Sequence, residues 1–146
     1  MFDLFDETQY QNFSNRLDQL SPDAKGQWGK MDAGQMLWHV NLFLEHPLNT
    51  SYKGNGKWLP RLFMRRMLLS EKPFKKNLPT MPGAKAVEPK DFAHYKQELQ
   101  KNLAEFKSRG TSHNWPDHKL IGKMSAQDWS HVQGKHLDHH FRQFGV

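Results

Sequence analysis

The chain of 146 residues contains no cysteine. It therefore has no disulfide framework, no thiolate ligand and no cysteine nucleophile, and any metal site must be built from nitrogen and oxygen. Long apolar runs are also missing. The longest candidate, Met36 to Leu44, is interrupted by His39 and Asn41 and falls far short of the ~20 residues that span a bilayer. Residues 1–7 are acidic and do not resemble a signal peptide. We therefore expect a soluble cytoplasmic protein without a membrane association.

Valine and isoleucine are scarce beside leucine, phenylalanine, tryptophan and methionine, which favours helices over sheets. No alternating strand pattern and no internal repeat is visible. Only 36% of the residues are hydrophobic, and the mean hydropathy is −0.88. The length nevertheless suffices for one domain with a buried core. We expect a single helical-bundle domain that spans residues 1–146.

Apolar residues at helical spacing predict four amphipathic helices. The second helix is expected to begin after Asp32 with a capping box and to stop at Pro47, and the third to open with Pro89 in its first turn. A long connection between them contains a short extra helix. The fold class predicted is all-α, a four-helix bundle. The expected helices cover residues 6–20, 32–47, 58–69, 89–109 and 125–143.

The net charge of +6 is concentrated between Lys53 and Lys76, where eight lysine and arginine residues face only Glu71. One interpretation is an anion-binding rim that attracts an acidic substrate, and the other is a solvated loop and helix face. The sequence contains no basic–aromatic repeat and no nucleic-acid-binding motif, so we expect no nucleic-acid partner.

Three of the nine histidines fall on apolar helix faces. At 100° per residue, His136 and His140 lie within about 20° of the direction of Trp129, in the middle of the apolar stripe of the last helix. His39 lies on the apolar face of the second helix. A lone inward histidine is commonly a satisfied core residue, but an i, i+4 pair is also typical of zinc-binding helices. Three imidazoles would leave coordination positions open, as catalytic metal sites do.

Several neighbours of these histidines have an expected place as well. Gln133 and Gln143 fall on the inner arc of the last helix and are candidates for hydrogen bonds that orient the ligands. His94 and His131 are expected on outer faces, and His139 at the edge of the apolar arc. No general base can be named, and the catalytic residues stay unknown.

Two sequence blocks carry a resemblance to a known family: Trp28 to His39 ends in the histidine of the second helix, and Lys135 to Gly145 contains His136 and His140. With this pattern the chain resembles the DinB-like (DNA-damage-inducible) superfamily of four-helix-bundle metalloproteins, and more narrowly a branch of unknown function. The family's hallmark is one histidine in the second helix and a His-x-x-x-His pair in the fourth. The resemblance covers nearly the whole chain, but residues 48–87 match no family role.

The resemblance implies a divalent metal held by His39, His136 and His140, with zinc or nickel most common and iron or manganese open. Characterised relatives are transferases and isomerases that use small thiols, together with hydrolases. The expected function is therefore a metal-dependent enzyme acting on a small molecule, either thiol transferase-like or hydrolase-like. The alternative is a non-catalytic metal-binding or protein-interaction bundle. In that case the amphipathic segment 58–69 would dock on a partner or form a homodimer.

Overall fold

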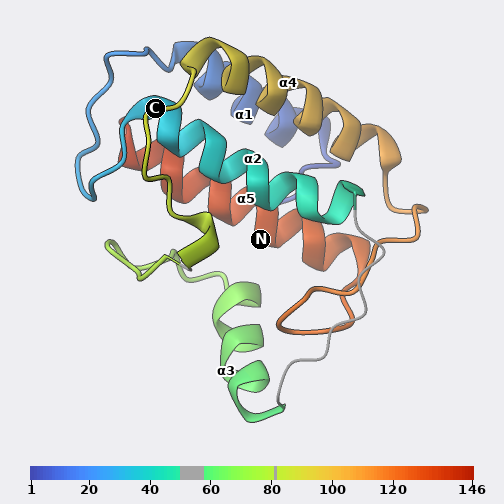
Figure 1. The fold of residues 1–146 in the computed structure, drawn as a ribbon. Coiled ribbons are helices and arrows are strands. Elements are labelled where there is room, and N and C mark those ends of the chain that lie inside the picture. Colours follow the sequence, from blue (N-terminus) through green and yellow to red (C-terminus); the bar gives the residue numbers. More distant parts are fainter. Residues whose placement is uncertain (50–57, 81) are drawn as a thin grey trace.

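Four long helices pack as a bundle in the computed structural model, which describes residues 1–49, 58–80 and 82–146. Figure 1 shows two of them, α2 and α5, running side by side, with the other two along one flank. The predicted all-α class is confirmed, since the described residues form no strand. None of their helices is long and apolar enough to cross a bilayer. The bundle helices are α1 (Glu7–Gln19), α2 (Ala33–Asn49), α4 (Phe92–Arg109) and α5 (Ala126–Gln143).

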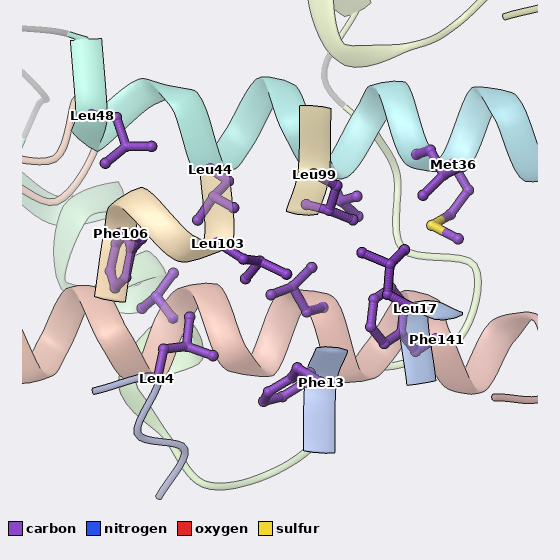
Figure 2. Packing of buried hydrophobic residues seen from close by; sticks show 14 of the residues in the cluster. Leu4, Phe13, Leu17, Met36, Leu44, Leu48, Leu99, Leu103, Phe106 and Phe141 are labelled. Atoms are coloured by element: carbon purple, nitrogen blue, oxygen red, sulfur yellow. The ribbon is translucent and has the colours of Figure 1, made fainter. Parts of the chain in front are cut away.

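The core lies where the apolar faces of these four helices meet, as helical periodicity predicts. Figure 2 shows leucine and phenylalanine side chains from all four helices interdigitating between the ribbons. Leu4, which precedes α1, adds a further fully buried side chain. The labelled residues of this layer are all buried: Leu4, Phe13, Leu17, Met36, Leu44, Leu48, Leu99, Leu103, Phe106 and Phe141.

Side-chain caps define where α2 and α4 begin. Asp32 and Gln35 form the predicted reciprocal box, in which each side chain accepts the other's backbone N–H over 2.7 and 3.0 Å. The expected start of the third bundle helix at Pro89 is wrong, because α4 begins only at Phe92. The Asp91 carboxylate accepts a backbone N–H of the first turn and so starts the helix three residues later than the proline.

The expected end of α2 at Pro47 is also wrong, because the helix continues to Asn49. A proline near the end of a helix removes only one backbone donor, and the carbonyl left without a helical partner is that of Phe43, four residues earlier. The side-chain amide of Gln133 donates to this oxygen over 3.0 Å. The structure thus replaces the missing helical hydrogen bond with one from α5, and the helix is not interrupted.

The N-terminal residues cover a face of α5 that was expected to face solvent. The Phe2 N–H donates to His131 Nδ1 over 3.0 Å, and the Leu4 N–H donates to the Ser130 hydroxyl over 2.6 Å. A Cβ atom on Gly134 would lie 2.6 Å from Phe2 Cβ, so this close approach requires glycine. The predicted outward position of His131 is therefore wrong, and its side chain is only 2% exposed.

The short helix α3 (Trp58–Leu69) lies against α5, beside the bundle (Figure 1). Its Met64, Leu68 and Leu69 pack against the core, so this segment covers part of the bundle. Leu62 and Phe63 lie on the outer side, 58% and 72% exposed. A homodimer through this helix stays a prediction.

Part of the basic segment holds α3 in place. Arg61 and Arg65 donate to main-chain carbonyls of the loop before α5 over 2.9 and 2.7 Å. Lys53 and Lys57 lie outside the described residues. Two of the eight cations are thus used for hydrogen bonds within the fold.

A buried lysine on α5 closes the C-terminal end of α3. Lys135 is 3% exposed, and its ammonium donates to the carbonyls of Met67 and Ser70 over 2.8 and 2.6 Å. Carbonyls at a helix C-terminus have no helical donors and carry a partial negative charge, so a cation is favourable there. Lys135 is therefore a buried polar link between α3 and the bundle, in addition to the bonds of Arg61 and Arg65.

We predict that Lys135→Met loosens α3 without unfolding the bundle. The substitution keeps an apolar stem of similar length but removes the charged donor from the carbonyls of Met67 and Ser70, which costs about 1–3 kcal/mol. The Ser70 hydroxyl and His131 remain as their other donors. Hydrogen exchange of the α3 amides should become faster, while the α4 amides keep their protection. Lys101→Met on the exposed face of α4 is the matched control. Unchanged exchange in α3 would contradict this role.

Candidate metal centre

Three histidines from two helices converge at one point between α2 and α5. Because the helices run antiparallel, His39 on α2 lies opposite His136 on α5, and His140 follows one turn later. One ring nitrogen from each lies within 4.8 Å of the others. The two closest atoms are Nε2 of His39 and Nε2 of His136, 3.1 Å apart. The structure thus brings together the three histidines that the sequence singled out.

The tautomer of His39 follows from the partner of its other nitrogen. Nδ1 lies 2.9 Å from the carbonyl oxygen of Ala84, in the short 3-10 helix η1 (Pro82–Ala84). A carbonyl only accepts, so Nδ1 carries the proton and Nε2 presents a lone pair toward His136. The long connection, which matched no family role, therefore orients the first histidine.

The tautomer of His140 is set by Gln143 in the same way. The amide nitrogen of Gln143 donates to the carbonyl of Trp28 over 2.7 Å, which identifies the other amide atom as the oxygen. That oxygen accepts from Nδ1 of His140 over 2.8 Å. Nε2 of His140 is then left as the atom that can bind a metal.

All three imidazoles are held in the neutral state, which is the form that binds metals. Burial lowers the pKa of His39 and lowers that of His136 well below its ordinary value, and the neighbouring imidazoles lower the pKa of His136 further. Burial also lowers the pKa of His140 to about 3. Lone pairs on two nitrogens 3.1 Å apart repel unless a proton or a cation lies between them. The residues present therefore fit a divalent metal.

The second glutamine singled out from the sequence has a different position. Gln133 lies on the inner side of α5, but its amide donates to the Phe43 carbonyl, and no hydrogen bond joins it to a described histidine of the cluster. Of the two glutamines, Gln143 is the one that touches an imidazole.

His139 is more enclosed than its expected position at the edge of the apolar arc. Its ring centroid lies 5.7 Å from that of Trp28, 5.9 Å from that of Phe74 and 5.0 Å from that of His140. The signal that could have placed it is Phe74, an aromatic residue between the prolines and lysines of the connection.

The three histidines lie on the wall of an apolar cavity of about 340 Å³ between α2, α3 and α5. Such a cavity is of the size that encloses a small molecule. One side of the histidine cluster is thus packed against the bundle, and the other is accessible to a ligand. The apolar part of the wall comprises Phe43, Met64, Met67, Leu68, Phe74, Leu78, Pro79, Leu120, Trp129 and Val132.

The protein is thus a helical bundle in which three converging histidines beside an apolar cavity could hold a metal ion. The chain belongs to the family described as "Protein of unknown function (DUF1569)", which matches residues 5–145. No curated protein and no solved structure gives a significant match to the chain.

We predict that Gln143→Leu weakens metal binding through His140. The leucine keeps the volume but removes the acceptor that holds the Nδ1 proton, and loss of such a partner typically lowers metal affinity about 10–100-fold. Competition with a chromophoric chelator measures this affinity, and urea unfolding reports any loss of stability separately. Gln100→Leu on exposed α4 is the control. An unchanged affinity would mean that Gln143 only stabilises the chain around Trp28.

Proposed function

We propose that the protein is a metal-dependent enzyme of the DinB-like type, with a divalent metal held by His39, His136 and His140. The observation that carries the proposal is the convergence of three neutral imidazoles, two of which, His39 and His140, have their outer nitrogens occupied by Ala84 and Gln143. Each of these partners turns a lone pair inward. The sequence resemblance of the two histidine blocks supports the same assignment.

Zinc or nickel is the metal that the family resemblance implies, and the donor set fits both. The cluster offers only imidazole nitrogen, without sulfur or carboxylate oxygen. Imidazole suits zinc, nickel, copper and iron, whereas manganese and magnesium prefer oxygen ligands. Bound there, the metal would supply a Lewis acid that lowers the pKa of a thiol or a water molecule.

The arrangement favours a catalytic site over a structural one. Structural zinc sites in proteins have four protein ligands, and catalytic sites have three ligands and an accessible position. Here three side chains converge, and the cavity lies on the accessible side. A small molecule in the cavity would therefore lie next to the metal.

The cavity favours a thiol over water as the nucleophile. No aspartate or glutamate is among the described residues that line it. Metal-dependent hydrolases of the zinc-peptidase kind use a carboxylate as general base, whereas a thiol with a lowered pKa needs none. The proposed reaction is attack of a low-molecular-weight thiol on a small electrophile. A carbon–sulfur bond forms, the leaving group departs with its bonding electrons, and the thiol proton passes to solvent.

Metal content distinguishes this proposal from a bundle without a site. We expect untagged wild-type protein to carry close to one equivalent of a divalent metal and both His39→Ala and His136→Ala to carry only traces. His94→Ala is the matched control, because this histidine lies exposed on α4. Elemental analysis by mass spectrometry measures all four proteins. Equal trace amounts of metal in all four proteins would contradict the proposed metal site.

Thiol transfer distinguishes an enzyme from a non-catalytic metal-binding module. In a screen of low-molecular-weight thiols against small electrophiles, we expect turnover that a chelator abolishes and added zinc or nickel restores. His136→Ala should lower the rate by at least about 100-fold, since it removes one of three ligands. Turnover that withstands both the chelator and His136→Ala would refute the mechanism. A metal-loaded protein without any turnover would favour the non-catalytic alternative.

A further inference from the structure

Several polar groups in the wall of the apolar cavity already have partners within the fold. The Trp129 indole N–H donates to the Pro116 carbonyl over 2.8 Å, and the Gln133 amide donates to the Phe43 carbonyl over 3.0 Å. Nδ1 of His118 accepts a backbone N–H of its own loop over 3.1 Å. The fold itself therefore uses these groups, and the ring nitrogens of the metal centre that face one another are the polar atoms best placed for a ligand.

The wall of the cavity also carries little charge. Burial lowers the pKa of every histidine that lines it, and that of His118 to about 4. Thr80 contributes an uncharged hydroxyl, and none of the described lining residues is acidic. Lys119 is the one cation among them, but it is exposed and already interacts with another group of the protein, so solvent screens its charge. A charged group that entered this space would lose its hydration without gaining a buried counter-charge.

Aromatic rings connect the apolar space to the metal centre. The Phe43 ring, on the wall of the cavity, has its centroid 5.0 Å from that of His39 and 4.8 Å from that of His136. Trp129 and Phe74 supply further rings from α5 and from the connection before α4. An apolar molecule that packs against Phe43 would therefore lie beside the three imidazoles.

The part of the wall that α3 supplies consists of Met64, Met67 and Leu68. Methionine side chains are flexible and polarisable, and they make favourable contacts with aromatic rings. The helix itself lies beside the bundle, packed on α5 (Figure 1). The two methionines can therefore adapt to different apolar shapes, and together with Val132 of α5 they set the size of the space.

We propose that the cavity binds an uncharged, largely apolar electrophile, with its body against Phe43, Met64, Met67 and Val132 and its reacting atom at the histidine cluster. A molecule of liquid water occupies about 30 Å³, so the cavity of about 340 Å³ corresponds to roughly ten non-hydrogen atoms. The role of this molecule as the electrophile rests on the proposed function. Its binding to the apolar wall does not require the metal.

The size of the bound molecule is tested by calorimetric titration of the full-length protein as purified with 1-butanol, 1-hexanol, 1-octanol and 1-decanol. Each added methylene should raise the affinity about fourfold until the cavity is filled, and the affinity should then stop rising. Val132→Phe fills part of the cavity and should move this limit to a shorter alcohol, whereas Met67→Ala should move it to a longer one. Val87→Phe is the matched control, because this valine is 83% exposed and does not line the cavity.

Three outcomes of this titration would overturn the proposal. They are the binding of no alcohol, a limit that stays at the same length in both cavity variants, and a shift in Val87→Phe as large as that in Val132→Phe. Circular dichroism checks that each variant is folded. If Val132→Phe does not fold, Met67→Ala carries the test alone, because it removes atoms and adds none.

The preference for an uncharged molecule is tested in the His136→Ala protein, where loss of one of the three ligands keeps a charged headgroup from binding through the metal. 1-Octanol is compared with octylammonium and with octanoate at pH 7. Both ions should bind at least about tenfold more weakly than the alcohol, because each would lose its hydration in the cavity. Since the two ions have opposite charges, the net charge of the protein cannot explain a loss with both. An ion that binds as tightly as 1-octanol would contradict the proposal.

Turnover separates this proposal from the proposed reaction. In the thiol-transfer assay of the metal-loaded protein, 1-bromooctane is compared with 8-bromooctanoate. Thiol sulfur bonds to the carbon, bromide leaves with the bonding electrons, and the thiol proton passes to solvent. We expect kcat/KM to be at least about tenfold larger for the uncharged bromide. Thiol transfer with equal kcat/KM for both bromides would reject the apolar electrophile and leave the reaction intact. Alcohol binding with the expected length limit but without any thiol transfer would reject the reaction and leave the apolar cavity site intact.

Discussion

The register between α2 and α5 is the constraint on which the rest of the structure depends. Side chains that must meet lie directly opposite each other along the two antiparallel helices: His39 meets His136, and His46 meets Trp129. The amide of Gln133 fixes this register through the Phe43 carbonyl. That carbonyl is available because Pro47 cannot donate to it. Pro47, the predicted end of the helix, thus leaves the Phe43 carbonyl free to accept the hydrogen bond that sets this register.

Segments outside α2 and α5 orient the histidines that these two helices bring together. The helices bring the imidazoles together, but backbone carbonyls outside them decide which nitrogen carries the proton in two of the three rings, those of His39 and His140. The Ala84 carbonyl acts directly on His39, and the Trp28 carbonyl acts through Gln143 on His140. Backbone carbonyls cannot lose their acceptor character through ionisation or substitution, so they fix a tautomer more durably than a titratable side chain would. The connection before α4 is therefore part of the site and not only a link.

The helices, their inward faces and the three clustered histidines were predictable because all of them follow from a period of 3.6 residues. Two errors concern helix ends, since neither Pro47 nor Pro89 marks a helix boundary in the structure. The third lies where one segment covers another. His131 is on the polar side of its own helix, yet residues at the N-terminus, far away in sequence, bury it. Periodicity describes only the helix that carries the pattern. The hydrogen bond from His39 to the Ala84 carbonyl could not be predicted, because every residue has a backbone carbonyl. The role of Lys135 could not be predicted either, because it depends on where α3 ends.

Burial alone does not distinguish a histidine that could bind a metal from a structural one, and the comparison of His39 with His131 shows which feature differs. Both side chains are buried, and both lie beside other aromatic rings. His131 has each nitrogen satisfied by the fold, since Nδ1 accepts from Phe2 and Nε2 lies 3.1 Å from the Ser70 carbonyl. His39 has only Nδ1 satisfied in this way, and its Nε2 faces another imidazole. A fold gains nothing from turning lone pairs toward each other inside a low-dielectric region, where the repulsion is strongest. Either a proton on Nε2 of His136 or a cation between the rings removes this repulsion, and in both cases Nε2 of His39 is a nitrogen that the fold leaves available to a metal.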